Sequence, residues 1–438
     1  KVDAHGMKAP PPEVKGDVEV FHYDARRVPP FLPEPDAPPS GNEYLPFVMV
    51  GAGDTGNDGL ARVYGDAFQD RWIRSAEVEA FAREAVGDKK GLEAVKALHA
   101  AVMKRFSGRD ASLAQSAAST VAQDRGSRLS VMKAGLETLG IPSRVAAVRT
   151  FNTDPAPYLF PADAQLPYAA LRVEVPGEAP VWVDTSVRFG PFGELPEAAM
   201  GEREAYLLPE PGKPLEKVKT PPLKPRAGKA VKLTLEIGTD GRLTGKGEEI
   251  YTGFDAAQIA EAFEQLSAES RNQALQGAVG RYFGGAELSS AKQERIEEVG
   301  APFVLRYEFT VPRFGRMESD GRMAMGALTF PALLGRRYVQ VSSRTTPLYI
   351  DDTEASRTDV TLTVPQGWKL SDPQANLKVD SEFGHFTRAE KQDGRTFSIA
   401  ESILLPRARV TPAQYEKFAA FAGDVDLLQV RELFLVKQ

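Results

Sequence analysis

The sequence predicts an α+β protein in which a mainly helical block precedes a strand-rich half. Residues 75–140 carry apolar side chains at helical spacing, and residues 143–190 carry short apolar or alternating runs that are typical of strands. Beyond a stretch rich in Pro and Lys at 209–230, residues 231–438 again show strand-like runs. These observations favour an α+β core followed by a β-rich α+β domain.

The composition is that of a globular chain without an electrostatic signal for nucleic acid. The 438 residues, 42% hydrophobic and 26% charged, are enough for roughly two to three domains. The net charge is -6, and affinity for phosphate rests on clustered Lys and Arg. No apolar run approaches the roughly 20 residues that cross a bilayer. We therefore expect neither a nucleic-acid partner nor a transmembrane segment in this chain.

The start of the chain and its lack of cysteine bear on its origin. The sequence begins with Lys1 instead of an initiator Met, and no hydrophobic signal region follows. We therefore expect this chain to be a piece of a longer polypeptide. The absence of Cys excludes disulfides and thiolate metal sites. It is compatible with both the cytoplasm and the periplasm.

Two Pro-rich segments mark the joints between domains. Residues 29–46 hold too many prolines for a helix or a central strand and indicate an extended connector after a strand-like piece at 18–23. Residues 209–230 interleave Pro with Lys and Arg, which predicts a semi-rigid basic linker. We interpret this linker as an exposed spacer; a docking site for an acidic partner or a lipid head group is the alternative.

The sequence pattern of residues 75–190 predicts three helices and a sheet. Apolar side chains recur at helical steps in residues 75–85 and 92–102. In residues 129–139 they fall on one helix face, before Gly140 ends that helix at its C′ position. The strands expected to pack on this third helix are Arg144–Arg149, Ala169–Val175 and Pro180–Asp184.

The second half predicts a hairpin, a long helix and further strands, without a recognisable chemical motif. Val231–Ile237 and Arg242–Tyr251 flank Gly-Thr-Asp-Gly, which is typical of a hairpin. Asp255, followed by Gln258, resembles a capping arrangement that opens a helix reaching about Phe283. A last helix opens at Thr411-Pro-Ala-Gln414. The further strands are expected at Phe303–Val311, Tyr338–Ser342, Asp359–Val364 and Arg395–Leu405.

A strand at 46–50 runs into Gly51-Ala-Gly-Asp-Thr-Gly56, which matches the dinucleotide-binding pattern G-x-G-x-x-G. Such a site needs a helix that starts within the motif and a second parallel strand soon after it. Here Asn57–Gly59 is expected to interrupt helix initiation, and helices are expected over 60–105. Asp54 would also face a pyrophosphate of the same charge. We therefore expect no nucleotide cofactor.

The same loop does not meet the requirements of a calcium site. Asp54, Asn57 and Asp58 are the oxygen-bearing side chains, but the twelfth position of an EF-hand spacing falls on Gly65 instead of Glu. We expect no metal site, and we interpret the segment as a flexible entry loop.

The stretch Asp124–Thr150, followed by Pro180–Asp184, resembles the core of the bacterial transglutaminase-like superfamily. In that family a Gly-Asp-Cys-Lys-Asp-Lys motif opens the core helix, and a turn like Leu139-Gly-Ile-Pro142 closes it. The resemblance implies a papain/transglutaminase-like core with flanking β-rich domains of unknown function. The domains it implies are 1–50 for the end of an N-terminal β-domain plus connector, 51–208 for the transglutaminase-like domain, 209–230 for the linker and 231–438 for the β-rich α+β domain.

The Cys-His-Asp triad of this family is degenerate in the chain. Counting back from Leu139 without gaps places Arg125 at the position of the Cys, while Tyr168 matches the His and Asp184 matches the Asp. A guanidinium stays protonated at any working pH, and a phenol titrates around pH 10. We therefore expect no catalytic residue, and we expect Asp184 to bond Arg125, a backbone N–H or a neighbouring Tyr.

Ser127 and Ser130, in the first turn of the same helix, are the alternative nucleophiles. A Ser hydroxyl needs a base, and the histidines are His5, His22, His99 and His385. His99 lies within a predicted helix, and the others fall outside the core domain. Ser127 fits better as the N-cap residue of the helix. A cryptic Ser-dependent hydrolase or acyltransferase that uses Asp184 stays open if His99 approaches in three dimensions.

Two functions follow from this pattern. The first is a catalytically inactive binding or scaffolding module for a protein or glycan partner, which the resemblance places in the periplasm or cell envelope, with the cytoplasm as the open alternative. The second is the cryptic hydrolase. Labelling of either serine by a fluorophosphonate probe separates the two.

Five aromatic residues are expected close to the position of the family's active-site cleft. We expect their side chains to lie in the core; the alternative is that two or more of them line a groove. These residues are Trp72, Tyr158, Phe160, Tyr168 and Trp182.

Overall fold

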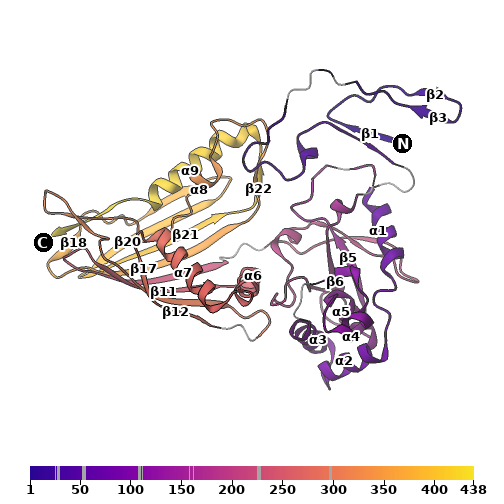
Figure 1. The fold of residues 1–438 in the computed structure, drawn as a ribbon, viewed down its shortest axis with the longest axis horizontal. Coiled ribbons are helices and arrows are strands. Elements are labelled where there is room, and N and C mark those ends of the chain that lie inside the picture. Colours follow the sequence, from indigo (N-terminus) through magenta and orange to yellow (C-terminus); the bar gives the residue numbers. More distant parts are fainter. Residues whose placement is uncertain are drawn as a thin grey trace. The chain divides into compact units, whose positions relative to one another are not determined.

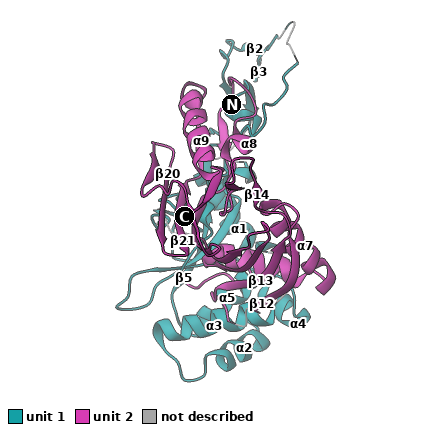
Figure 2. Cartoon of the chain, turned by 90° about the vertical axis from the view of Figure 1, so that its left-hand side faces the viewer, with its two compact units in different colours: residues 1–186, 193–224 teal, residues 187–192, 225–438 magenta. Residues whose placement is uncertain are grey.

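The chain forms two compact units (Figure 2), each of which contains helices and strands, so the predicted α+β class is confirmed. Unit 1 comprises residues 1–186 and 193–224, and unit 2 comprises residues 187–192 and 225–438. The computed structural model describes residues 1–24, 26, 30–51, 56–106, 110, 112–156, 158–160, 162–223, 228–294 and 298–438.

Unit 1 is organised around helix α5 (Arg128–Thr138), whose residues from Arg128 to Leu136 are all buried. The other helices described in this unit are α1 (Gly56–Phe68), α2 (Ala76–Val86), α3 (Gly91–Arg105) and α4 (Ala117–Gln123). Helices α2, α3 and α4 all contact α5, as the cluster in Figure 1 illustrates. The helical block predicted from residue 75 onward is therefore present.

A five-stranded antiparallel sheet, in the order β7-β6-β5-β8-β9, completes unit 1. Its strands are β5 (Ser143–Val148), β6 (Tyr168–Val173), β7 (Val181–Val183), β8 (Glu204–Leu207) and β9 (Glu216–Lys219). Helix α5 packs on β5 and β6. Strand β9 lies within residues 209–230, which the sequence predicts to be a linker, and it extends the sheet by pairing with β8.

Gly140 ends helix α5 as the sequence predicts. Its φ of 67° lies in the left-handed region, which costs a glycine little. The amide of Gly140 donates to the Glu137 carbonyl at 3.1 Å, and that of Ile141 donates to the Leu136 carbonyl at 2.9 Å. These two bonds form a Schellman motif. The chain then passes directly into β5.

The N-terminal residues form two small antiparallel strand pairs. β1 (Val2–His5) pairs with β4 (Phe47–Val50), and β2 (Glu13–Lys15) pairs with β3 (Val18–Val20). The strand-like piece predicted at 18–23 thus contains β3.

The structure corrects one expectation about the glycine-rich loop. Helix α1 begins at Gly56, so Asn57–Gly59 does not interrupt helix initiation. Asp58 lies in the first turn, where a negative charge favours the helix, and it pairs with Lys217 Nζ at 2.7 Å. Residues 52–55, Asp54 included, lie outside the described part of the chain.

Unit 2 is built on an eight-stranded sheet in the order β12-β13-β11-β10-β17-β21-β20-β19 (Figure 1). Neighbouring strands are antiparallel except β10 and β17, which run parallel. The predicted hairpin is present as β10 and β11. The strands are β10 (Lys229–Ile237), β11 (Leu243–Tyr251), β12 (Glu287–Glu294), β13 (Phe303–Val311), β17 (Glu354–Thr363), β19 (Leu377–Asp380), β20 (His385–Asp393) and β21 (Thr396–Leu405).

Smaller sheets pack against this large sheet. The four-stranded sheet β14-β15-β23-β18 contributes Met323, Leu433 and Trp368 to a hydrophobic cluster that also contains Leu235 and Phe397 of the large sheet. Its strands are β14 (Arg316–Met317), β15 (Met323–Met325), β18 (Trp368–Leu370) and β23 (Leu433–Lys437). A further pair joins β16 (Leu348–Ile350) to β22 (Ala408–Val410).

Two glycines of β11 lie opposite aromatic residues of β13. Gly245 pairs with Phe309, and Gly247 pairs with Tyr307. A Cβ atom at either glycine would overlap the facing ring. The rings therefore occupy the space that a side chain on β11 would need, which explains glycine in the interior of this strand.

The long helix predicted from Asp255 to Phe283 is two helices, α6 (Gly253–Glu264) and α7 (Ala268–Tyr282). Ser267 separates them, because its Oγ accepts a hydrogen bond from the Ser270 amide at 3.1 Å and so caps a new helix.

The strand predicted at 338–342 is also absent, because Tyr338 ends the short helix α8 (Leu334–Tyr338). The carboxylate of Asp426, on α9 (Tyr415–Gln429), accepts from the amides of Leu334 and Gly335 at 2.7 and 2.8 Å. A residue distant in the sequence therefore accepts the hydrogen bonds of the otherwise free amides at the start of this helix.

Candidate functional site

The candidate site lies in unit 1, where the first turn of α5 faces the chain that follows β7. Ser127 is the N-cap, and its Oγ accepts from the Ser130 amide at 3.0 Å. Asp110 Oδ1 accepts from the Arg128 amide at 2.7 Å. Free N–H groups and the helix dipole favour negative charge at such a position, and the Asp110 carboxylate supplies it.

Arg128 fills the space in front of this turn. Its guanidinium donates to the backbone oxygens of Phe106 at 3.1 Å, Thr185 at 2.7 Å and Ser186 at 2.7 Å. Its Nε lies 3.9 Å from Asp110 Oδ1, and the whole side chain is only 1% exposed. The side chain thus ties the start of α5 to the ends of α3 and β7.

Tyr168 and Asp184 lie together beside Arg128. The Tyr168 hydroxyl donates to Asp184 Oδ1 at 2.5 Å, while the Ser186 hydroxyl donates to the same oxygen at 2.7 Å and the Ser186 amide to Oδ2 at 3.0 Å. Burial, and then the charge of Asp184, raise the pKa of Tyr168 well above its usual value. The phenol therefore stays a hydrogen-bond donor at neutral pH.

His99 reaches the same region from α3. Its Nε2 lies 3.0 Å from the backbone oxygen of Asp184, and the side chain is buried. A carbonyl oxygen only accepts hydrogen bonds, so Nε2 must carry the proton. Burial lowers the pKa of His99, against the opposing effect of Asp184. At Nε2 this imidazole therefore acts as a donor and not as a base.

The carboxyl group of Asp110 has an unusual pKa. Burial raises its pKa to about 6, although Arg128 and the amides of Arg128 and Ser112 favour the charged form. This carboxyl group therefore titrates close to neutral pH.

Ser127 and Ser130 are fully buried and hydrogen-bonded. Ser127 Oγ donates to the Ser112 carbonyl, and Ser130 Oγ donates to the Gln115 carbonyl at 2.9 Å. The two hydroxyl oxygens lie 2.8 Å apart. Within the described residues, both hydroxyl protons point at backbone oxygens rather than at an imidazole or a carboxylate.

The structure brings together two of the three predicted triad positions. Tyr168 and Asp184 are in contact, whereas Arg125 is exposed and precedes the first residue of α5 by three positions. The arginine beside Asp110 is Arg128. Sequence reasoning missed Arg128 and Asp110, although the N-cap assigned to Ser127 already implied that the helix starts at the next residue.

A groove of about 350 Å³ lies next to Tyr168. Helix α1 contributes Tyr64 and Phe68, whose ring centroids are 5.6 Å apart, and Leu113 and Leu166 form buried walls. The remaining lining residues are Ser112, Ala147, Pro167 and Ala169. The groove is mainly apolar, with Tyr168 at its border with the buried polar cluster.

Of the five aromatic residues that the sequence singles out, Tyr168 lines this groove. Trp72, Phe160 and Trp182 are buried, and the Tyr158 hydroxyl donates to Asp154 Oδ2. Tyr64 and Phe68 therefore supply the aromatic surface of the groove together with Tyr168.

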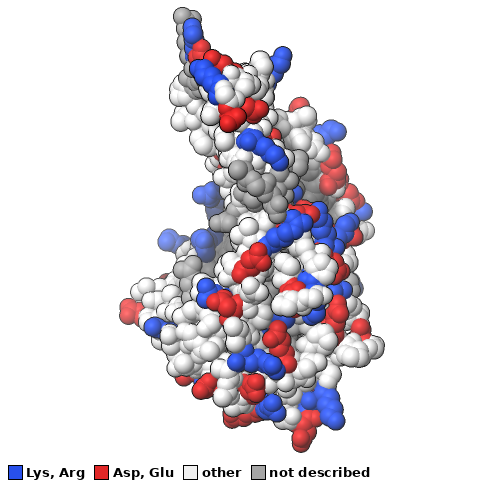
Figure 3. Space-filling view, turned by 90° about the vertical axis from the view of Figure 1, so that its right-hand side faces the viewer, with Lys and Arg blue, Asp and Glu red and all other residues white. Residues whose placement is uncertain are grey.

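On the face that Figure 3 shows, Lys and Arg are interspersed with Asp and Glu. No group of three His, Asp or Glu side chains in the described ranges is arranged to hold a metal ion. No described helix combines the length and the apolar character that a membrane span requires.

Comparison with known proteins gives a family match over part of the chain and a likeness to solved structures, one of which is described below. Residues 325–434 match a domain of unknown function with a solved structure, DUF3858. The crystal structure of a "putative protease" from Parabacteroides distasonis is similar over 99% of this chain and 69% of its own, with 14% identity and a TM-score of 0.57. At this identity the likeness shows the fold alone. No curated protein matches the chain.

Proposed function

We propose that the protein is a catalytically inactive transglutaminase-like protein that acts as a binding or scaffolding module. In this proposal, unit 1 is a papain/transglutaminase-like core whose acyl-transfer chemistry has been replaced by a buried hydrogen-bond cluster. The proposal rests on the resemblance of residues 124–184 to that superfamily and on the geometry at the start of α5.

One observation carries this proposal: the guanidinium of Arg128 stands at the helix N-terminus and is bonded to three backbone carbonyls. A papain-like site needs a thiolate there, paired with an imidazole that an Asp orients. Arg128 cannot attack a carbonyl, because it stays protonated. The Tyr168 phenol, held on Asp184 with a raised pKa, is a poor base at neutral pH.

The alternative function, a hydrolase that uses Ser127 or Ser130, has less support. A nucleophilic serine needs an accessible hydroxyl within reach of a base. Both hydroxyls are buried, and each donates to a backbone carbonyl. Their positions suit capping of α5.

We place the binding surface of this module at the groove lined by Tyr64, Phe68 and Tyr168. Aromatic faces suit the apolar faces of sugar rings and extended peptide segments, so the proposed partner is a glycan or a protein. The proposed location, the periplasm or cell envelope, follows from the resemblance.

Chemical labelling tests the absence of catalysis. The folded protein, Ser127→Ala and Ser130→Ala are treated with a fluorophosphonate probe and analysed by mass spectrometry. We expect no labelling of either serine. Stoichiometric labelling of the native protein that one Ala substitution abolishes would establish the hydrolase instead.

Cosedimentation with purified peptidoglycan sacculi and pull-down from a bacterial envelope extract test binding. We expect Tyr64→Ala to weaken retention at least several-fold. Val63→Ala is the matched control, since Val63 is 57% exposed on the same helix and does not line the groove. Equal retention of both variants would contradict the proposed surface.

A further inference from the structure

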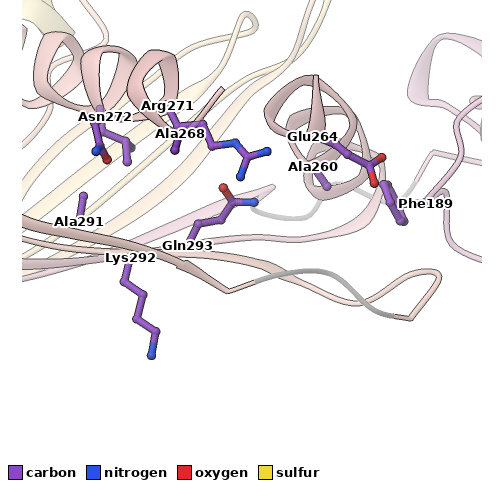
Figure 4. A pocket seen from close by; sticks show the side chains of 10 residues that line it. Phe189, Ala260, Glu264, Ala268, Arg271, Asn272, Ala291, Lys292 and Gln293 are labelled. Carbon is purple, nitrogen blue, oxygen red and sulfur yellow. The ribbon is translucent and has the colours of Figure 1, made fainter. Parts of the chain in front are cut away.

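A second cavity lies in unit 2, and nine of its ten lining residues fall between Ala260 and Gln293. It has a volume of about 530 Å³ and lies among α6, α7 and β12 (Figure 4). Ala260 and Leu275 belong to its lining and also to a hydrophobic cluster of the unit, and the lining residues Phe189 and Ala291 pack against that cluster. This volume and this apolar floor suit a small organic molecule.

Arg271 supplies a cation beside the apolar floor of this cavity. Its Nε donates to the Phe263 carbonyl at 2.7 Å, which fixes the orientation of the guanidinium. Figure 4 shows the terminal nitrogens of Arg271 directed toward the side chain of Gln293. No carboxylate in the described part of the chain forms an ion pair with Arg271. A planar guanidinium held in this way is suited to a carboxylate, which it can bind through two parallel hydrogen bonds.

The acidic residue of the cavity is already neutralised. Glu264 Oε2 pairs with Arg188 Nη1, and in Figure 4 its side chain lies beside Phe189 rather than beside Arg271. The side chains facing the cavity therefore leave the charge of Arg271 uncompensated within the described residues. The electrostatics favour an anion at this end of the cavity.

Successive side chains of β12 point to opposite faces of the strand, so Lys292 and Gln293 lie on different sides. Ala291 and Gln293 are partly buried, whereas Lys292 is exposed, as expected for successive residues on opposite faces of a strand. Figure 4 shows Lys292 directed away from Arg271. Lys292 thus carries the same charge as Arg271 at the same cavity but does not face its interior, which makes it a matched control.

We propose that this cavity binds a carboxylate that carries an apolar group. The guanidinium of Arg271 binds the carboxylate, the amide of Gln293 donates a further hydrogen bond, and the apolar group packs on Ala260, Leu275 and Ala291. The carboxylate belongs either to a small organic acid or to the C-terminus of a peptide that ends in an apolar residue.

Calorimetric titration of the full chain tests this proposal with four probes. Octanoate and octanamide differ in charge but share an apolar chain, and a tetrapeptide ending in Leu is used as the free acid and as the amide. We expect at least one acid to bind at least tenfold more tightly than its amide. Binding of octanoate identifies a small organic acid as the source, and binding of the peptide acid alone identifies a protein C-terminus.

Variants locate the binding. Arg271→Met is expected to raise the Kd of the bound acid at least tenfold, whereas Lys292→Met should leave it within twofold. Ala291→Phe places a larger side chain in the cavity while keeping the charge of Arg271, and it should also raise the Kd at least tenfold, which covers the case in which Arg271→Met fails to fold. The proposal is wrong if neither acid binds, if amides bind as tightly as acids, or if Lys292→Met weakens binding as much as Arg271→Met.

Discussion

The hydroxyl of Tyr168 donates to Asp184 Oδ1 at 2.5 Å, in a buried part of unit 1. Asp184 also accepts hydrogen bonds from the hydroxyl and the amide of Ser186, so three donors from its own unit bind this carboxylate. Because these bonds are internal, their loss should be measurable as a loss of stability, whatever the protein binds.

Tyr168→Phe removes one donor from the Asp184 carboxylate. We expect the free energy of unfolding of unit 1 to fall by about 1–3 kcal/mol, because a buried charged acceptor loses a partner. Urea unfolding can be followed by tryptophan fluorescence in a Trp368→Phe background, which leaves Trp72 and Trp182, both in unit 1. Tyr23→Phe, at an exposed tyrosine, is the control. Equal stabilities of the two variants would contradict the assigned bond.

Arg128→Met tests which arginine belongs to the cluster. The substitution leaves three carbonyls without their buried donor and Asp110 without its neighbouring cation, so we expect a loss of about 3–5 kcal/mol or a failure to fold. Arg125→Met, at the exposed arginine three residues earlier, should change stability by less than about 0.5 kcal/mol. The same fluorescence assay measures both, and a larger effect at Arg125 would refute the arrangement.

Asp110 should make the stability of unit 1 depend on pH. Its pKa is about 6 in the folded chain and near its ordinary value of 3.8 when unfolded. Between these values the folded state keeps a proton that the unfolded state has released, so the stabilisation is full below about pH 4 and is lost as the pH rises through 6. The loss is about 3 kcal/mol, at about 1.4 kcal/mol for each pKa unit.

Asp110→Asn isolates this contribution, because the amide does not titrate. The stability difference between the native protein and Asp110→Asn should shrink by about 3 kcal/mol from pH 4 to pH 7 in urea unfolding. A difference that stays constant over this range would show that the Asp110 carboxyl has an ordinary pKa.

Gly247→Ala tests the packing of Tyr307 over β11. The new methyl group would overlap the ring, so we expect a loss of about 1–3 kcal/mol from unit 2. Gly277→Ala is the matched substitution on α7, where the added Cβ meets no atom within 4 Å and should stabilise the helix by about 0.5–1 kcal/mol. Trp368 fluorescence in a Trp72→Phe, Trp182→Phe background reports on unit 2. Opposite signs are expected, and a neutral Gly247→Ala would refute the contact.

Local signals in the sequence predicted the ends of several elements. Gly140 ends α5 through a Schellman motif, and Thr411 with Gln414 forms the capping box before α9. The hairpin of β10 and β11 follows from its turn residues and alternating pattern. In each case the deciding hydrogen bonds join residues close in the sequence, so the pattern contains the information.

Elements that depend on distant residues were not predictable in this way. The free amides at the start of α8 donate to the carboxylate of Asp426, which lies on the last helix. Because this partner is distant in the sequence, the local pattern gave no sign of the helix, and a strand was predicted at 338–342. The candidate site shows the same limit. A gap-free count from Leu139 pointed to Arg125, whereas burial against Phe106, Thr185 and Ser186 selects Arg128. Only the packing of separate segments identifies that residue.

The parallel pairing of β10 with β17 has a consequence for any attempt to express the DUF3858 segment alone. The segment 325–434 contains β17 but not β10, so its boundary runs through the middle of one continuous sheet. An excised fragment would expose the edge of β17 along which Ser356–Thr363 pair with β10, and such an unpaired edge favours association between copies. The bounds of the family match therefore do not coincide with those of unit 2, and a fragment that keeps this sheet intact has to include β10, which begins at Lys229.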